Sequence, residues 1–325
     1  MALNTTKIIF GHNLFEDTTM PWAKTKKNMV NRIKLIIIAW LFISISFHAQ
    51  SFEIATFNIQ NFGQSKMAKT DVVDTLAMIV RQFDIVAVQE ISDVSNQTAG
   101  AFLKVVNANG ARYKLSCSDR TGREPDDRKS AEQYAYYYDS RTVTLTDAAL
   151  YKDVNDDFQR EPYIASFTRK SDSLTFVVCT IHTAPEQAVE EIAALAKVAK
   201  WIPTHFKNAK RIIFCGDFNA SCSYASPAAL NALAIRKAPY HWVVPDDADT
   251  NLSASACAYD RFVVTENLRS MIGGWEVYRA FKSKKVSDHW PVVLKIEQRA
   301  KSKSKCNEDP AQAGEQRAKN KEEHI

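Results

Sequence analysis

The chain has 325 residues, of which 46% are hydrophobic and 24% charged, so it can bury a full core and is neither fibrous nor disordered as a whole. The formal net charge is +5, and the excess of basic residues lies at the two ends: residues 1–50 contain six Lys or Arg and two acids, and residues 299–325 contain seven and five. Residues 51–298 therefore have a net charge of −1, which excludes a body that holds a polyanion by bulk attraction alone.

The first 50 residues have the features of a secretory leader. The apolar stretch Leu35–Phe47 follows two basic residues, precedes Ala49, and is short for a membrane span. Because Met29 would begin a leader of ordinary length, we expect an upstream extension followed by a signal peptide at residues 29–50; a retained signal anchor is the alternative. Cleavage would give a secreted, extracellular protein without stable membrane association.

The body alternates predicted strands with two predicted helices. Apolar residues from Val72 to Phe83 recur at helical spacing, and an amphipathic helix runs from Pro185 to Trp201. Short apolar runs predict strands at Phe52–Phe57, Asp84–Val88, Tyr134–Tyr138, Thr142–Leu145, Ile164–Thr168, Leu174–Ile181, Ile212–Phe214, Phe262–Val264, Trp275–Tyr278 and Pro291–Ile296. This order favours two sheets packed face to face and covered by helices in one domain, residues 51–298. The tail, residues 299–325, is expected to be disordered.

The cysteines within the body differ in their surroundings. Cys179 and Cys215 lie in strand-like apolar runs, where packed thiols are expected. Cys222 and Cys257 lie in polar, turn-rich segments, and we predict a disulfide between them, which fits an exported protein.

Polar and titratable side chains stand at the ends of the predicted strands. They are Asn58, Glu90, Glu132, His182, Asp217, Asn219, Asp260, Asp288 and His289. Taken singly, each residue has an ordinary interpretation as a cap or a solvated loop residue. Together they supply what phosphodiester hydrolysis needs: a base for water, an acid for the leaving oxygen and hard oxygen ligands for a divalent cation. The pattern predicts a hydrolase that needs no Ser or Cys nucleophile.

Six segments resemble deoxyribonuclease I and its secreted relatives, in the endonuclease/exonuclease/phosphatase superfamily. They are TFNIQNFGQSKM from Thr56, FDIVAVQE from Phe83, GDFNASCSY from Gly216, PDDADT from Pro245, CAYDR from Cys257 and SDHWPV from Ser287. The resemblance implies an α/β fold, a four-layered α/β/β/α sandwich with two packed central mixed sheets. It also implies an enzyme, a secreted endonuclease that hydrolyses DNA with Mg²⁺ (or Mn²⁺) and Ca²⁺.

The resemblance implies a role for each residue of the site. Two catalytic pairs are expected, His182 with Glu132 and His289 with Asp260; His289 would activate water and His182 would protonate the leaving 3′-oxygen. The catalytic cation would be held by Glu90, Asp217 and Asp288. The substrate phosphate would be bound by Asn58, Arg160 and Asn219. Structural Ca²⁺ would be bound by two loops, one with Asp249, Asn251, Ser253 and Ser255 and one with Asp156 and Glu161.

Two departures from the family pattern leave the substrate preference open. Ser92 and Ser130 stand where the family has an arginine and a tyrosine that enter the minor groove of DNA. The choice between single- and double-stranded DNA is therefore open. Whether the protein binds actin is also open, and we expect a monomer. The alternatives are a phosphodiesterase of the same superfamily acting on abasic DNA, a phosphoinositide or sphingomyelin, and a non-catalytic binding protein on this fold.

Overall fold

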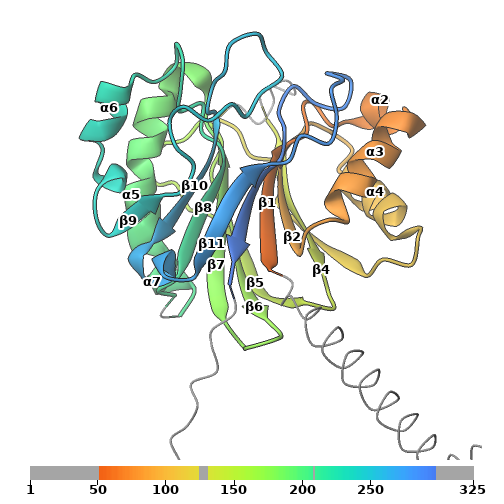
Figure 1. Cartoon of the computed structure of the whole chain (residues 1–325), viewed down its shortest axis with the longest axis horizontal. Helices are drawn as coiled ribbons and strands as arrows, with labels where there is room; N and C mark the ends of the chain where they lie inside the picture. The colour runs from red at the N-terminus through yellow and green to blue at the C-terminus, as the bar shows by residue number, and fades with distance from the viewer. Residues whose placement is uncertain (1–50, 124–130, 208, 298–325) are drawn as a thin grey trace, which may run out of the picture. The chain divides into compact units, whose positions relative to one another are not determined.

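The computed structural model describes residues 51–123, 131–207 and 209–297. The predictions for residues 1–50 and for the tail lie outside this range. Within it, twelve strands form two six-stranded sheets (Figure 1). The first sheet has the order β11-β12-β1-β2-β4-β3, with β1 (Phe52–Asn58), β2 (Ile85–Ile91), β3 (Tyr113–Cys117), β4 (Gln133–Asp139), β11 (Ile272–Val277) and β12 (Val292–Ile296).

The second sheet has the order β5-β6-β7-β8-β10-β9. Its strands are β5 (Val143–Leu150), β6 (Tyr163–Arg169), β7 (Thr175–His182), β8 (Ile212–Asp217), β9 (Tyr240–Trp242) and β10 (Asp260–Thr265). Both sheets are mixed: β1 runs parallel to β2 and β7 parallel to β8, whereas the other neighbouring strands are antiparallel.

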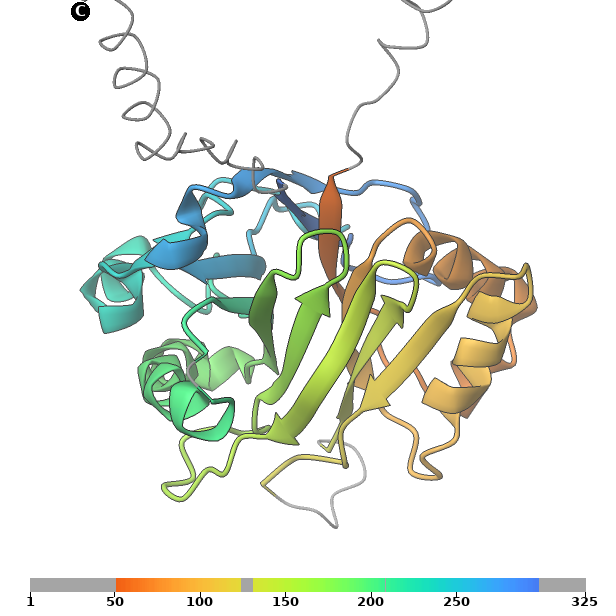
Figure 2. The same cartoon turned by 90° about the horizontal axis from the view of Figure 1, so that it is seen from below.

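Helices cover the outer face of each sheet. In Figures 1 and 2, α3 and α4 lie against the first sheet and α5 lies against the second. The helices are α2 (Gln64–Met67), α3 (Thr70–Val80), α4 (Thr98–Asn107), α5 (Ala188–His205), α6 (Pro227–Ala232) and α7 (Glu266–Arg269), with 3₁₀ turns at Pro185–Gln187 and Ala234–Arg236. Among the described residues, no helix is both long enough and apolar enough to cross a bilayer.

Three layers of apolar side chains hold the four layers of backbone together. The middle one lies between the two sheets and includes Ile54, Tyr136 and Phe262. A second, which includes Leu76 and Phe102, joins α3 and α4 to the first sheet, and a third joins α5 to the second sheet. The four-layered sandwich implied by the resemblance is confirmed.

Several observed elements differ from the sequence predictions or were not predicted, among them α2, α6, α7 and β9. The helix predicted from Pro185 begins at Ala188, because the residues before it form a 3₁₀ turn. Helix α4 and strand β3 were not predicted; α4 contains Gly100 and only a short apolar face, and β3 is an edge strand with exposed Lys114. Short edge elements give weak periodic signals because little of their surface is buried.

Candidate active site

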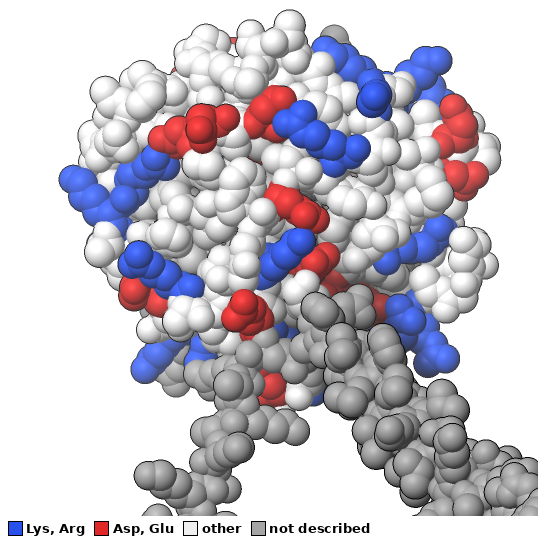
Figure 3. Space-filling view, viewed as in Figure 1, with Lys and Arg blue, Asp and Glu red and all other residues white. Residues whose placement is uncertain are grey.

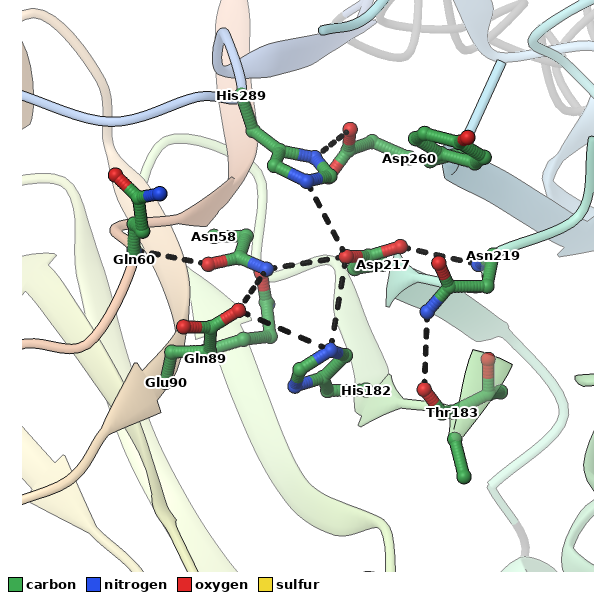
Figure 4. Close-up of polar contacts among 12 residues, drawn as sticks. Asn58, Gln60, Gln89, Glu90, His182, Thr183, Asp217, Asn219, Asp260 and His289 are labelled. Atoms are coloured by element: carbon green, nitrogen blue, oxygen red, sulfur yellow. Dashed lines mark hydrogen bonds and ion pairs between the residues drawn. The ribbon is translucent and has the colours of Figure 1, made fainter. Parts of the chain in front are cut away.

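Strand directions bring the predicted site residues to one edge of the sandwich. The parallel strands β1, β2, β7 and β8 end there, and the antiparallel strands β4, β10 and β12 begin there. The register places His182 beside Asp217 and Asp217 beside Asp260 on three neighbouring strands. Residues far apart in sequence therefore form one cluster (Figure 4).

Close packing of β7 against β8 requires glycine at Gly216. Its φ of 140° is rarely adopted by other residues, and an added Cβ atom would lie 1.9 Å from the carbonyl oxygen of Ile181. Gly216 precedes Asp217, so this contact fixes the approach of Asp217 to His182.

The first imidazole–carboxylate pair is His182 with Glu132. His182 Nδ1 lies 3.0 Å from Glu132 Oε2, and its Nε2 lies 3.7 Å from Asp217 Oδ2. Burial is the largest single effect and opposes the charged form of each partner. The mutual attraction and hydrogen bond, with Asp217 acting on His182 and Arg160 acting on Glu132, together outweigh it, so the pKa of His182 is raised and that of Glu132 is lowered. Arg160 lies 3.5 Å from Glu132 and opposes the rise at His182.

The second pair is His289 with Asp260. His289 Nδ1 lies 2.8 Å from Asp260 Oδ2, and its Nε2 lies 3.5 Å from Asp217 Oδ2, the oxygen that also faces His182. Burial would lower the pKa of His289, but Asp260 and Asp217 outweigh it and raise the value to about 10. Ser287 fixes the backbone, since its hydroxyl donates to the Asn58 carbonyl oxygen and accepts from the His289 N–H.

A carboxylate pair lies between the imidazoles. The Asn58 amide donates to Glu90 Oε1 at 2.7 Å and to Asp217 Oδ2 at 3.0 Å, so both carboxylates lie against one nitrogen. The second Glu90 oxygen accepts from the Asn61 N–H at 2.7 Å. Burial would raise the pKa of Asp217, but His289 and His182, followed by hydrogen bonds from Asn219 and Asn58, hold it below its usual range.

A β-bulge aims the Glu90 carboxylate. The β2–β4 register shifts between Val88 and Ile91, and Glu90 has a φ of 64°. This conformation costs a non-glycine residue about 1–3 kcal/mol and persists only when its surroundings fix it. Here the hydrogen bonds from Asn58 and Asn61 to its carboxylate do so.

The donor set of this cluster fits a hard divalent cation. Glu90 and Asp217 are close enough to share one amide, so their negative charges repel each other and a bound cation would offset this repulsion. Carboxylate oxygens are the ligands that Mg²⁺ and Ca²⁺ prefer. Asp288, partly exposed beside His289, raises the pKa of that imidazole and supplies a third carboxylate near the cluster. Ligand atoms of Asp217, Asp260 and His289 also lie within 4.8 Å of one another. However, Asp260 and His289 already bind each other, so we favour the predicted set.

Two of the predicted phosphate-binding residues, Asn219 and Arg160, are buried and contact different groups of the site. Asn219 is buried beside Asp217; its N–H donates to Asp217 and its side-chain amide donates to the Thr183 carbonyl oxygen. Arg160 is also buried, with Nε and Nη2 directed at the His182 carbonyl oxygen and Nη1 near Glu132. In this geometry Arg160 supports the His182 pair, and its contact with substrate stays a prediction.

The loops predicted to bind calcium have internal contacts of their own. Asn251 donates to the Ser255 and Cys257 carbonyl oxygens and accepts from the Ser253 N–H, while Asp249 is paired with Arg279. In the other loop, Asp156 is paired with Arg123, and Glu161 accepts from the Thr121 hydroxyl. Calcium binding at either loop stays a prediction.

The predicted disulfide between Cys222 and Cys257 is present. It connects the loop after Asn219 to the segment just before Asp260, and so ties together two loops of the site. Among the described cysteines, Cys117, Cys179 and Cys215 are free thiols. Of the two departures from the family pattern, Ser92 lies in the loop after β2, and Ser130 is outside the described residues.

Sequence reasoning missed two residues near the site, Lys66 and Tyr259. The Tyr259 ring lies 6.0 Å from that of His289, centroid to centroid. Buried Lys66 donates to the carbonyl oxygens of Ile59 and Gln60; burial lowers its pKa to about 8, against the attraction of Glu90 and Asp288. Their place in the sequence could have identified them, because Lys66 and Tyr259 both lie inside motifs that carry the family resemblance.

The described geometry agrees with the family found by comparison. Residues 55–289 match the model of the Endonuclease/Exonuclease/phosphatase family, and the chain belongs to that family. Within it, the chain belongs to the deoxyribonuclease I group. It is 34% identical over 272 residues to deoxyribonuclease-1-like 1 of Chlorocebus aethiops, covering 79% of this chain and 88% of that protein. It is 32% identical over 270 residues to deoxyribonuclease-1 of Bos taurus, covering 76% and 92%.

Solved structures support the fold. The mannosyl-6-phosphatase of Bacteroides thetaiotaomicron superposes with a TM-score of 0.54 at 18% identity, over 76% of this chain and all of that chain. The human Nocturnin catalytic domain gives a TM-score of 0.55 at 13% identity, over 76% and 93%. At such low identity the likeness extends to the fold and not to the substrate.

Proposed function

We propose that this protein is a secreted, divalent-cation-dependent endonuclease that hydrolyses phosphodiester bonds in DNA. One observation carries the proposal: the Nε2 atoms of His182 and His289 face the same oxygen of Asp217, at 3.7 and 3.5 Å, and each Nδ1 is held by a buried carboxylate. A reacting phosphate beside Asp217 would lie between the two imidazoles, which is the arrangement that acid–base hydrolysis needs.

Each side chain has a proposed task in the reaction. His289 takes the proton of the attacking water and His182 donates a proton to the leaving 3′-oxygen, with Asp260 and Glu132 fixing the ring orientations. Asn58, Asn219 and Arg160 bind the phosphate oxygens. Glu90, Asp217 and Asp288 would hold the cation, and a bound Mg²⁺ or Mn²⁺ supplies positive charge that stabilises the phosphoryl oxygens.

Relatives and surface charge support DNA as the substrate without strong bulk attraction. The relatives of 32–34% identity are named deoxyribonucleases and align over most of their length. Figure 3 shows acidic and basic side chains interspersed on one face, in keeping with the net charge of −1 over residues 51–298. Binding would then depend on short-range contacts at the site.

Secretion and the structural ions complete the proposal. The Cys222–Cys257 disulfide supports an oxidising, extracellular compartment and thus the signal peptide at residues 29–50. We propose that the protein acts as a monomer and that Ca²⁺ stabilises the two loops named above. The carboxylates at Asp249, Asp156 and Glu161 are the charged ligands that such sites need.

Nicking of supercoiled plasmid tests the proposal. The purified protein with Mg²⁺ and Ca²⁺ should convert supercoiled plasmid to the nicked form near neutral pH. Activity should be lost in EDTA and in His182→Ala, while an exposed control, Lys152→Ala, stays active. Nicking that survives EDTA would contradict the cation role, and an inactive wild-type protein would contradict the function.

A further inference from the structure

A buried polar layer lies directly beneath the catalytic residues. Side chains two residues apart on a strand share a face. Thr56, Thr180 and Cys215 therefore lie one step inside the catalytic residues of β1, β7 and β8. All three are fully buried, and the space they occupy between the sheets continues into the apolar core.

Gln89 of β2 connects this layer across the two sheets. The two hydrogens on its Nε2 are shared among three acceptors: Thr180 Oγ1 at 2.8 Å, the Ala87 carbonyl oxygen at 3.0 Å and Thr56 Oγ1 at 3.1 Å. Thr56 belongs to the first sheet and Thr180 to the second. The amide of Gln89 therefore links the two sheets.

Cys215 completes the layer on β8. Burial raises the pKa of its thiol to about 12, against hydrogen bonds with Thr180 and Thr56. The thiol is thus neutral at physiological pH, and it acts as a packed, weakly polar neighbour of the two threonines.

Stability alone does not account for Gln89. Ile85 and Ala87, on the same face of β2, belong to the apolar core between the sheets. Gln89 is fully buried, and its Oε1 has no hydrogen-bond partner in the described structure. An unpaired buried carbonyl costs about 1–3 kcal/mol, so an apolar side chain would be expected here on stability grounds. A polar side chain that lowers stability and lies next to the catalytic cluster is expected to serve that cluster.

The contacts of Gln89 couple two catalytic residues on different sheets. The next residue is Glu90, whose bulge lets both side chains reach the space between the sheets. Thr180 lies two residues before His182 on β7. Glu90 Oε1 and His182 Nε2 are 3.9 Å apart, so a small movement of either strand end changes this distance directly.

We propose that Gln89 is a positioning residue that sets the spacing between Glu90 and His182 from beneath. This inference rests on the proposed function, since it requires both residues to act on one phosphate. Gln89 itself touches no substrate in this proposal. Its effect comes from holding the ends of β1, β2 and β7 in register. The effect can be large, since misplacement of a catalytic group by about 1 Å can lower a rate about 100-fold.

Gln89→Met tests the proposal in the full-length protein, because methionine keeps the length of the side chain and removes its hydrogen bonds. We expect kcat for plasmid nicking to fall about 100-fold, KM to change less than about threefold, and the melting temperature to stay equal or rise. Thr180→Val should lower kcat about tenfold. The double variant should match Gln89→Met, because both changes remove the same contact.

Ser116→Ala is the matched control. It removes a buried hydrogen bond of 2.7 Å between the Ser116 and Tyr163 hydroxyls, which lie on different sheets. Neither residue belongs to the polar layer or to the catalytic cluster. It should lower the melting temperature and leave kcat unchanged. An unchanged kcat in Gln89→Met, or a loss equal to that in Ser116→Ala, overturns the proposal. If Gln89→Met does not fold, Thr180→Val decides by the same criteria.

A readout without turnover separates this inference from the proposed function. Nitrogen NMR shifts of the His182 ring at fixed pH report its hydrogen bonding whether or not DNA is cleaved. We expect them to change in Gln89→Met and to stay unchanged in Ser116→Ala. Identical shifts in all three proteins overturn the positioning role, whereas an inactive wild-type protein with the expected shifts overturns only the nuclease assignment.

Discussion

The two imidazole–carboxylate pairs have nearly the same geometry and different electrostatic surroundings. Nδ1 binds its carboxylate at 3.0 Å in His182 and at 2.8 Å in His289, and both Nε2 atoms face one oxygen of Asp217. Glu132, however, has Arg160 at 3.5 Å. Within the described residues, Asp260 forms no ion pair with Lys or Arg.

This difference shows that one motif can give two proton affinities. Arg160 opposes the rise in the pKa of His182, whereas Asp260, Asp217 and Asp288 raise the pKa of His289 to about 10 without an opposing cation. The proposed base role of His289 requires its neutral form. Positive charge held by Asp217 and Asp288 would lower its pKa toward the working range, which ties the role of His289 to the proposed cation site.

The largest expected effect comes from removing either imidazole. His182→Asn and His289→Asn should each lower kcat for plasmid nicking about 1000-fold, because each would remove one proton-transfer group. In the pH profile of kcat/KM, His289→Asn should lose the acidic limb and His182→Asn the basic limb. The opposite result would exchange the two roles, and near-normal activity in one variant would leave a single functional imidazole.

Arg160→Met should make the electrostatic surroundings of the two imidazole–carboxylate pairs alike, because it removes the cation beside Glu132. It leaves the buried Glu132 carboxylate without its cation, so the free energy of unfolding should fall by about 3 kcal/mol at pH 7. The folded pKa of Glu132 is lowered, so its stabilising contribution is present above the unfolded value near 4.5 and is lost as the pH falls through the folded value. The difference between the proteins in urea unfolding should therefore narrow below about pH 4.5.

Arg141→Met is the control for that experiment. Arg141 is exposed and paired with Asp139, so its removal should change the free energy of unfolding by less than about 1 kcal/mol. Equal effects of the two substitutions would show that Arg160 does not stabilise the first pair.

Loss of the disulfide should act on the second pair. Cys222 and Cys257 are 35 residues apart in sequence, and their covalent link should contribute about 2 kcal/mol to stability. The double serine variant should melt several degrees lower and lose activity at lower temperature than the wild type. Cys117→Ser, which removes a free thiol, should change neither property.

The smallest expected effect is a slope in stability above neutral pH. The folded pKa of His289 is raised above its ordinary 6.5 to about 10, so its contribution is fully present below pH 6.5 and is lost as the pH rises toward 10. Between pH 7 and 8 the free energy of unfolding should fall by up to about 1.4 kcal/mol. Asp260→Asn should flatten this slope in thermal melts, and an unchanged slope would assign it to other groups.

Sequence patterns predicted the parts of the site that depend on strand ends. His182, Asp217 and Asp260 each lie at the terminus of a buried apolar run, and the parallel and antiparallel directions bring those termini together. The bulge at Glu90 and the buried course of Arg160 could not be predicted in this way, because they depend on contacts between segments distant in sequence. The contacts of Gln89 could not be predicted for the same reason, since its partner Thr180 lies 91 residues away.

Pairing of the first described strand with the last makes completion of the fold a late event in synthesis. β1 and β12 are hydrogen-bonded neighbours, with Phe52 opposite Ile296, and Ser287 reaches back to the end of β1. While β12 is still inside the ribosome it cannot pair with β1, so the proposed site would be completed only near the end of synthesis.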